Sequence, residues 1–80
     1  MITQQQCRAA RELLGWGFDN LAQAAGITQT TVLNFELGHT EPYQPTQAKM
    51  SRAFEAAGVE FFTDKDGGPG VRKRKPRGSP

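Results

Sequence analysis

Apolar residues recur at helical spacing in four segments of this 80-residue chain. In the first segment, Cys7, Ala10 and Leu14 stand three and then four positions apart, which places them on one face of a helix over about residues 4–14. The same kind of spacing predicts three further helices, over about residues 18–25, 29–37 and 46–57. We therefore expect an all-α core, a compact four-helix domain.

The pattern changes after the fourth predicted helix. Residues 59–63 (VEFFT) and 70–74 (GVRKR) have the composition of strands, and the turn-rich segment DKDGGP lies between them. These residues predict a short C-terminal β-hairpin. Because an isolated hairpin is only marginally stable, it has to dock on the helices or pair with another chain.

The chain divides into three parts on this basis. We expect the helices and the first strand over residues 1–63, the turn and second strand over residues 64–74, and a disordered basic tail over residues 75–80. Two prolines three residues apart predict a loop over residues 39–45.

The most informative segment runs from Leu21 to Gly38. Gly26 can end the first of its two helices in a left-handed conformation, and Thr28 can cap the second. Three polar side chains near the start of the second helix are expected to face outward: Gln29, Thr30 and Asn34. Two helices joined by a short turn with glycine are typical of the helix-turn-helix of DNA-binding proteins.

Composition excludes several other classes of protein. The single cysteine, Cys7, excludes a disulfide within the chain and a metal site made of cysteines alone. The single histidine, His39, has no neighbouring arrangement typical of catalysis. No apolar run approaches the roughly 18–20 residues that span a bilayer, and the N-terminus lacks the apolar centre of a signal peptide. We expect a cytoplasmic protein that is not an enzyme and has no metal, cofactor or membrane partner.

The net charge of +2 conceals an asymmetry. Residues 1–65 carry five Lys or Arg and seven Asp or Glu, a net charge of −2, whereas residues 66–80 carry five Lys or Arg and one Asp, a net charge of +4. The helical part is therefore not basic, which counts against strong nonspecific DNA affinity. The basic C-terminal run is either solvated surface or a set of phosphate contacts.

Short motifs over about residues 2–74 follow one known pattern. The first helix and turn contain CRAAR and LGW, the central segment contains LA, AGIT, TV and NFE, and the C-terminal part contains AAGVEF and GGPGVR. Together these motifs resemble the Cro/C1-type (XRE family) helix-turn-helix transcriptional regulators, in particular a bacterial subgroup that ends in this way. The resemblance implies a lambda-repressor-like fold, DNA recognition by the helix at about residues 29–37, repression of transcription and a twofold homodimer.

The resemblance also implies roles for individual residues. Base edges in the major groove of double-stranded DNA would be contacted by three side chains: Gln29, Thr30 and Asn34. Phosphate contacts would come from Gly17, Thr28, His39 and Thr40. The positive charge of the C-terminal segment separately predicts phosphate contacts by Arg72, Lys73 and Arg74. Glu36 would join the helices by pairing with a basic residue of the first helix, either Arg11 or Arg8.

Three apolar residues depart from the family pattern: Phe18, Leu33 and Leu37. Phe18 stands where a phosphate-contacting glutamine is common, and the two leucines occupy positions that are usually small or polar. As scattered surface residues they need no explanation. As one exposed patch they favour an alternative function, a protein-interaction module of the antitoxin or anti-activator kind with a protein partner. An antitoxin-type autoregulator would bind both DNA and protein.

The strand over residues 59–63 is the best candidate for self-association. In an extended strand Phe61 and Phe62 point to opposite faces, so one can cover the helices while the other contacts a second chain. We expect Val59, Phe61 or Phe62 in a homodimer interface. The alternative is a monomer in which both phenylalanines pack on the fourth helix.

Overall fold

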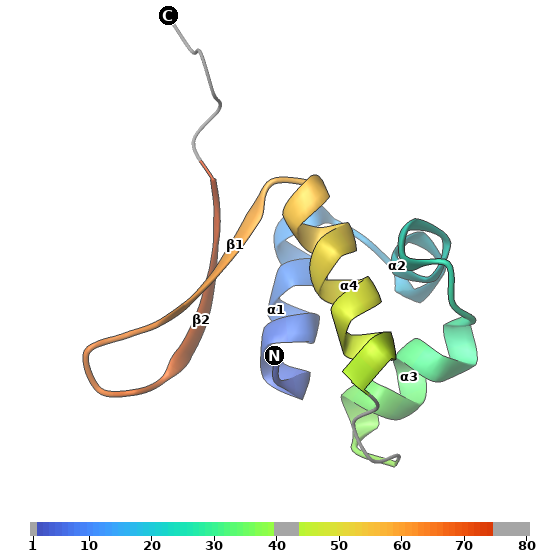
Figure 1. Ribbon diagram of the computed structural model, residues 1–80, viewed down its shortest axis with the longest axis horizontal. Helices are drawn as coiled ribbons and strands as arrows, with labels where there is room; N and C mark the ends of the chain where they lie inside the picture. Colours follow the sequence, from blue (N-terminus) through green and yellow to red (C-terminus); the bar gives the residue numbers. More distant parts are fainter. Residues whose placement is uncertain (1, 40–43, 75–80) are drawn as a thin grey trace, which may run out of the picture.

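The computed structural model describes residues 2–39 and 44–74. Four helices precede an antiparallel hairpin: α1 (Gln4–Leu14), α2 (Phe18–Ala25), α3 (Gln29–Leu37), α4 (Gln44–Ala56), β1 (Val59–Thr63) and β2 (Pro69–Lys73). Figure 1 shows the hairpin beside α1, with its turn projecting beyond the helices. The predicted four helices and C-terminal hairpin are confirmed.

The first three helices begin and end where the sequence predicts. At the start of α1, the Thr3 hydroxyl accepts a hydrogen bond from the Gln6 backbone N–H, and the Gln6 side-chain oxygen accepts one from the Thr3 N–H, both at 3.0 Å. This capping box satisfies two N–H groups that have no partner within the helix. A capping box acts within a few residues of the chain, so the local sequence could predict where α1 begins.

The start of α4 differs from the prediction. The helix begins at Gln44 and ends at Ala56, so Pro45 lies in its first turn instead of in a loop. Proline is tolerated there because its missing N–H would have had no partner within the helix. Strand β2 is likewise shifted by one residue, since it starts at Pro69 and ends at Lys73. Residues 40–43 and the predicted tail, residues 75–80, lie outside the described residues.

One hydrophobic core joins the helices to the hairpin. Its largest fully buried side chains come from every described helix and from β1: Cys7, Leu21, Val32, Met50, Phe54 and Val59. The Trp16 ring stacks on Phe54 with 5.8 Å between ring centroids, and the Phe61 ring meets Phe54 edge-on at 5.9 Å. Such aromatic pairs add to the stability gained from apolar burial.

The hairpin therefore docks on the helices of its own chain. Its strands pair with Phe61 opposite Val71, and the Gln6 side chain of α1 donates a hydrogen bond to the Gly70 carbonyl at 3.2 Å. The Phe62 ring lies so close to Gly70 that a Cβ on that residue would stand 2.5 Å from a ring carbon. A side chain at position 70 would therefore require the Phe62 ring to move.

The burial of Val59 corrects one expectation about assembly. Its side chain has no exposed surface, so it cannot contact a second chain while the fold is intact. Phe61 is half-buried against Phe54. Phe62 is also half-buried, and the Arg72 guanidinium lies 4.8 Å from its ring centroid.

Candidate nucleic-acid interface

A three-residue turn, residues 26–28, joins α2 to α3. Gly26 has a φ of 71°, a left-handed conformation that glycine adopts without steric cost. Its N–H donates to the Gln23 carbonyl at 3.3 Å, and the Ile27 N–H donates to the Ala22 carbonyl at 2.9 Å. Ile27 packs against the core. These contacts determine the direction in which α3 leaves the turn.

The N-terminus of α3 is capped by Thr28. The Thr28 hydroxyl oxygen accepts a hydrogen bond from the Thr31 N–H at 3.2 Å and lies 2.8 Å from the Thr31 hydroxyl. Thr28 is exposed, as are Gln29 and Thr30. The remaining N–H groups of the first turn and the helix dipole give this end a partial positive charge, which suits an anion such as phosphate.

Two leucines share the outer face of α3 with the polar residues. At about 100° per residue, five side chains follow one another around roughly 140° of the helix: Gln29, Leu33, Leu37, Thr30 and Asn34. All are exposed except Asn34, which is half-buried. Val32 and Phe35 lie on the opposite face and are buried. The leucines therefore lie between polar side chains and do not form a separate surface.

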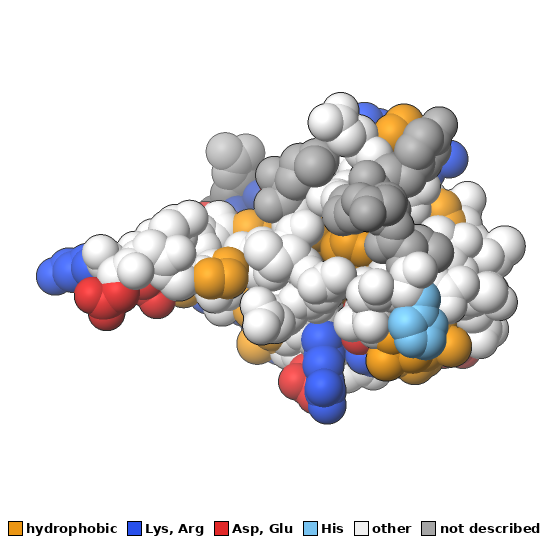
Figure 2. Space-filling model, turned by 90° about the horizontal axis from the view of Figure 1, so that it is seen from below, with side chains coloured by type: hydrophobic (Ala, Val, Ile, Leu, Met, Phe, Trp, Pro, Cys, Tyr) orange, Lys and Arg blue, Asp and Glu red, His pale blue; other side chains and the backbone are white. Residues whose placement is uncertain are grey.

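The leucines are the most exposed large apolar side chains of this region. Leu33 is 38% exposed and Leu37 is 58% exposed. Figure 2 shows hydrophobic side chains gathered beside the single histidine, His39, which is the second residue after the end of α3. The outer face of α3 is thus part polar and part apolar.

A buried ion pair holds α3 against α1. The Arg11 guanidinium donates from Nε to Glu36 Oε2 at 2.6 Å and from Nη2 to Oε1 at 2.8 Å. A third bond joins Arg11 Nη1 to the Trp16 carbonyl at 3.0 Å. Arg8 instead forms a pair with Glu12 on α1 itself. Of the two candidates for pairing with Glu36, the structure selects Arg11.

Cys7 takes part in the same arrangement, which the sequence did not indicate. Its thiol donates to Glu36 Oε2 at 3.3 Å. Burial, and then the neighbouring Glu36 carboxylate, raise the pKa of the Cys7 thiol far above its ordinary value. With its pKa raised in this way, the thiol stays protonated and acts as a hydrogen-bond donor. Because the thiolate is the form that reacts or binds metals, Cys7 has a structural role.

Phe18 does not belong to an exposed patch with the leucines. It is half-buried and packs against the core, and the Arg11 guanidinium lies 4.3 Å from its ring centroid. Of the three residues in the alternative reading of one exposed patch, only Leu33 and Leu37 are exposed. Because a cation over an aromatic ring is a stabilising contact, Phe18 helps to hold the Arg11 guanidinium in place.

The expected phosphate-contacting residues fall into separate places. Gly17 caps α2, and its N–H already donates to the Asn20 side chain at 2.8 Å. His39 is exposed at the other end of α3 from Thr28. Thr40 lies outside the described residues. Thr28 alone among these stands at the helix N-terminus with Gln29 and Thr30.

The basic residues of β2, Arg72 and Lys73, and the following Arg74 lie apart from α3. Figure 1 shows β2 and α3 on opposite sides of α1 and α4. Arg72 pairs with Glu60 at 3.5 Å, and Arg74 donates to the Glu55 carbonyl at 3.0 Å, while Lys73 is exposed. In a single chain these cations and the N-terminus of α3 do not form one continuous surface.

Helices α2 and α3 themselves contain no Lys or Arg. Between Arg11 and Lys49 the sequence contains no Lys or Arg, while it contains Glu12, Asp19, Glu36 and Glu41. The absence of Lys and Arg from these 37 residues could be read from the sequence, and it identifies the helices that lack phosphate-binding cations more directly than the overall charge asymmetry does. The groups that α3 itself offers to an anion are hydroxyl and backbone N–H groups.

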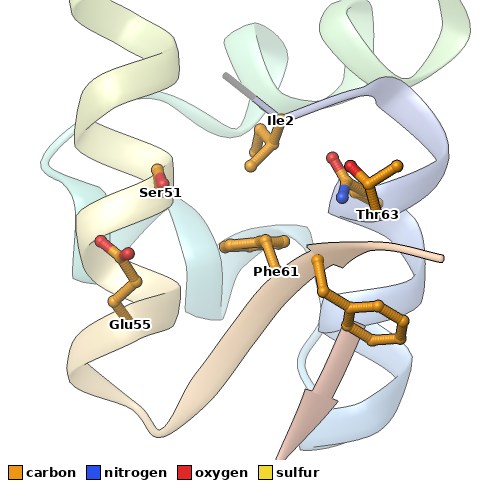
Figure 3. A pocket seen from close by; sticks show the side chains of 7 residues that line it. Ile2, Ser51, Glu55, Phe61 and Thr63 are labelled. Atoms are coloured by element: carbon orange, nitrogen blue, oxygen red, sulfur yellow. The ribbon is translucent and has the colours of Figure 1, made fainter. Parts of the chain in front are cut away.

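A shallow groove lies apart from this face, between α1, α4 and β1. Its lining consists of Ile2, Gln6, Ser51, Glu55, Phe61, Phe62 and Thr63. Figure 3 shows Ser51 and Glu55 on α4 with Phe61 of β1 pointing toward that helix. Glu55 is the one ionisable group in this lining, so we assign no chemistry to the groove.

Within residues 2–39 and 44–74, no three His, Cys, Asp or Glu side chains come together as metal ligands. No helix in that part of the chain has the length and apolar character needed to cross a membrane. No protein-family model matches the chain, and no curated protein matches it.

Proposed function

We propose that this protein is a sequence-specific DNA-binding regulator that inserts the N-terminal part of α3 into the major groove. The observation that carries the proposal is the solvent-facing start of α3, where the N-cap residue Thr28 precedes Gln29 and Thr30. In a helix-turn-helix the N-terminal residues of the second helix contact base edges. Bound at an operator, such a domain blocks polymerase and acts as a repressor.

The side chains at this position have suitable chemistry. The amide of Gln29 can form two hydrogen bonds with N6 and N7 of adenine, and the Thr30 methyl can contact the methyl of thymine. Asn34 is half-buried, so it contributes less surface than the other two. The Thr28 hydroxyl and the first N–H groups of α3 are suited to a phosphate.

Rigidity supports the same proposal. The Arg11–Glu36 ion pair links α3 to α1, and Arg11 also contacts Phe18 at the start of α2. A base contact requires its side chain to be held within fractions of an ångström, and sites on packed helices meet that need better than loops. The buried pair positions the helix and does not itself contact DNA.

A selection experiment tests the proposal. The protein is incubated with a library of random duplexes, and the bound duplexes are sequenced. We expect one preferred motif, and we expect Gln29→Ala to weaken binding to it by about 1–3 kcal/mol and to relax one position in each half-site. Gln5→Ala, an exposed glutamine of α1, is the matched control and should change neither. If Gln29→Ala and the unmodified protein select the same motif with equal strength, α3 is not the recognition helix.

A protein-interaction module is the second candidate, and one observation favours it. Leu33 and Leu37 are exposed on a helix that contains no Lys or Arg, although phosphate contacts by such residues usually dominate DNA affinity. The same selection discriminates between the two candidates. Binding without any preferred motif favours a protein partner.

We further propose that two copies act together, because one recognition helix contacts only a few base pairs. Two half-sites then lie about 34 Å apart, one turn of DNA. With Val59 buried in its own chain, the outward face of the hairpin, where Phe62 and Arg72 meet, is the candidate surface for pairing.

A further inference from the structure

Leu33 stands between the polar residues that the proposed function assigns to base contacts. Its side chain is 38% exposed and lies about 40° around the helix from Gln29, one turn further along. Leucine has no hydrogen-bonding group, whereas most of the base atoms in the major groove are donors or acceptors. The exception is the 5-methyl group of thymine, which is apolar.

We propose that Leu33 contacts a thymine methyl group and makes the outer face of α3 selective for A·T pairs. This inference rests on the proposed DNA-binding function. Gln29 and Thr30, on either side of Leu33, suit adenine and the thymine methyl respectively. The neighbouring residues of α3 therefore favour the same kind of base pair.

The composition of α3 supports this preference independently. Arg and Lys are the side chains that most commonly contact guanine, through O6 and N7, and α3 contains neither. Glu36 is the one residue of α3 with a charged side chain, and it is occupied by Arg11. The helix thus has an apolar contact for thymine and no cationic contact for guanine.

Position, and not exposure alone, distinguishes Leu33. Exposed leucines are common on protein surfaces and need no function. Leu13 of α1 is 36% exposed, nearly the same as Leu33, but it lies outside the face of α3. Leu13 therefore provides a matched control of the same residue type and exposure.

The test removes single methyl groups from the DNA. In the preferred duplex, each thymine is replaced in turn by deoxyuridine, which lacks the 5-methyl group but pairs as thymine does. We expect deoxyuridine to weaken binding about fourfold at one thymine in each half-site that Leu33 contacts, the effect of burying one methyl group. At that thymine Leu33→Ala should bind the thymine and deoxyuridine duplexes equally, whereas Leu13→Ala and Thr30→Ala should keep the fourfold difference. Thermal unfolding of both variants confirms that they fold.

The outcomes separate the two levels of the proposal. If Leu33→Ala keeps the discrimination, or if no single deoxyuridine changes affinity, the methyl contact is overturned. DNA binding by α3 still stands in that case, provided that Gln29→Ala alters the motif. If no duplex is preferred at all, both proposals are overturned, and the exposed leucines are assigned to a protein partner.

Discussion

Arg11 and Glu36 are 25 residues apart in the sequence and form a two-point ion pair between α1 and α3. Their side chains are 13% and 6% exposed. A carboxylate with this little access to water needs a partner, and Glu36 has both the guanidinium and the Cys7 thiol. The pair thereby determines how the candidate recognition helix sits on the rest of the domain.

Loss of one member of this pair should destabilise the protein strongly. We expect Glu36→Ala to lower the free energy of unfolding by about 3–5 kcal/mol, because it leaves the Arg11 charge buried without its partner. The control is Glu12→Ala, which breaks the exposed Arg8–Glu12 pair and should cost below about 1 kcal/mol. Urea denaturation measures both values. Equal effects would show that the buried pair is not a major source of stability.

Stability should decline at alkaline pH because of Cys7. Its pKa is raised in the folded state, so the folded protein keeps the thiol proton at a pH where the unfolded chain loses it. The contribution is complete below the thiol's ordinary pKa of 9.0 and is lost as the pH rises above it, at up to about 1.4 kcal/mol per pH unit.

The measurement compares the unmodified protein with Cys7→Ala between pH 8 and about pH 10.5, a range that brackets the ordinary pKa of a thiol. Other groups titrate in this range too, so the difference between the two slopes isolates the thiol. We expect the slope of Cys7→Ala to be shallower, whatever its stability at neutral pH. Parallel slopes would contradict a protonated buried thiol.

The basic residues of β2 and Arg74, which follows it, should not affect base preference, because they lie on the other side of α1 and α4 from α3. We expect the combined substitution of Arg72, Lys73 and Arg74 by Gln to leave the selected motif unchanged. Any loss of affinity should fall equally on selected and random duplexes, with a shallower dependence of log K on log salt. A changed motif would mean that β2 contributes to base recognition.

The outward face of the hairpin should carry the homodimer contact. We expect Phe62→Ser to shift the protein toward monomer at micromolar concentration in sedimentation experiments, because the ring with its Arg72 contact is the main apolar group on that face. Thr63→Ser, an exposed neighbour in the same strand, is the control. A monomeric unmodified protein, or an unchanged mass for Phe62→Ser, rejects this interface.

Local sequence signals determined the ends of the helices. Thr3 with Gln6, and Gly26 with Thr28, act through contacts within about four residues, so the first three helices matched their predicted bounds. The predicted start of α4 was wrong, because Pro45 is compatible with either a loop or a first helical turn and the local sequence does not choose between them.

Only the tertiary structure decided which of the candidate residues share a surface. Whether Phe18 is covered depends on Arg11, and whether Val59 is available depends on the core that α4 and the other helices build around it. The separation of Arg72 from α3 depends on how the hairpin docks against α1. These outcomes arise from contacts between residues distant in the chain, which hydrophobic periodicity and capping patterns do not encode.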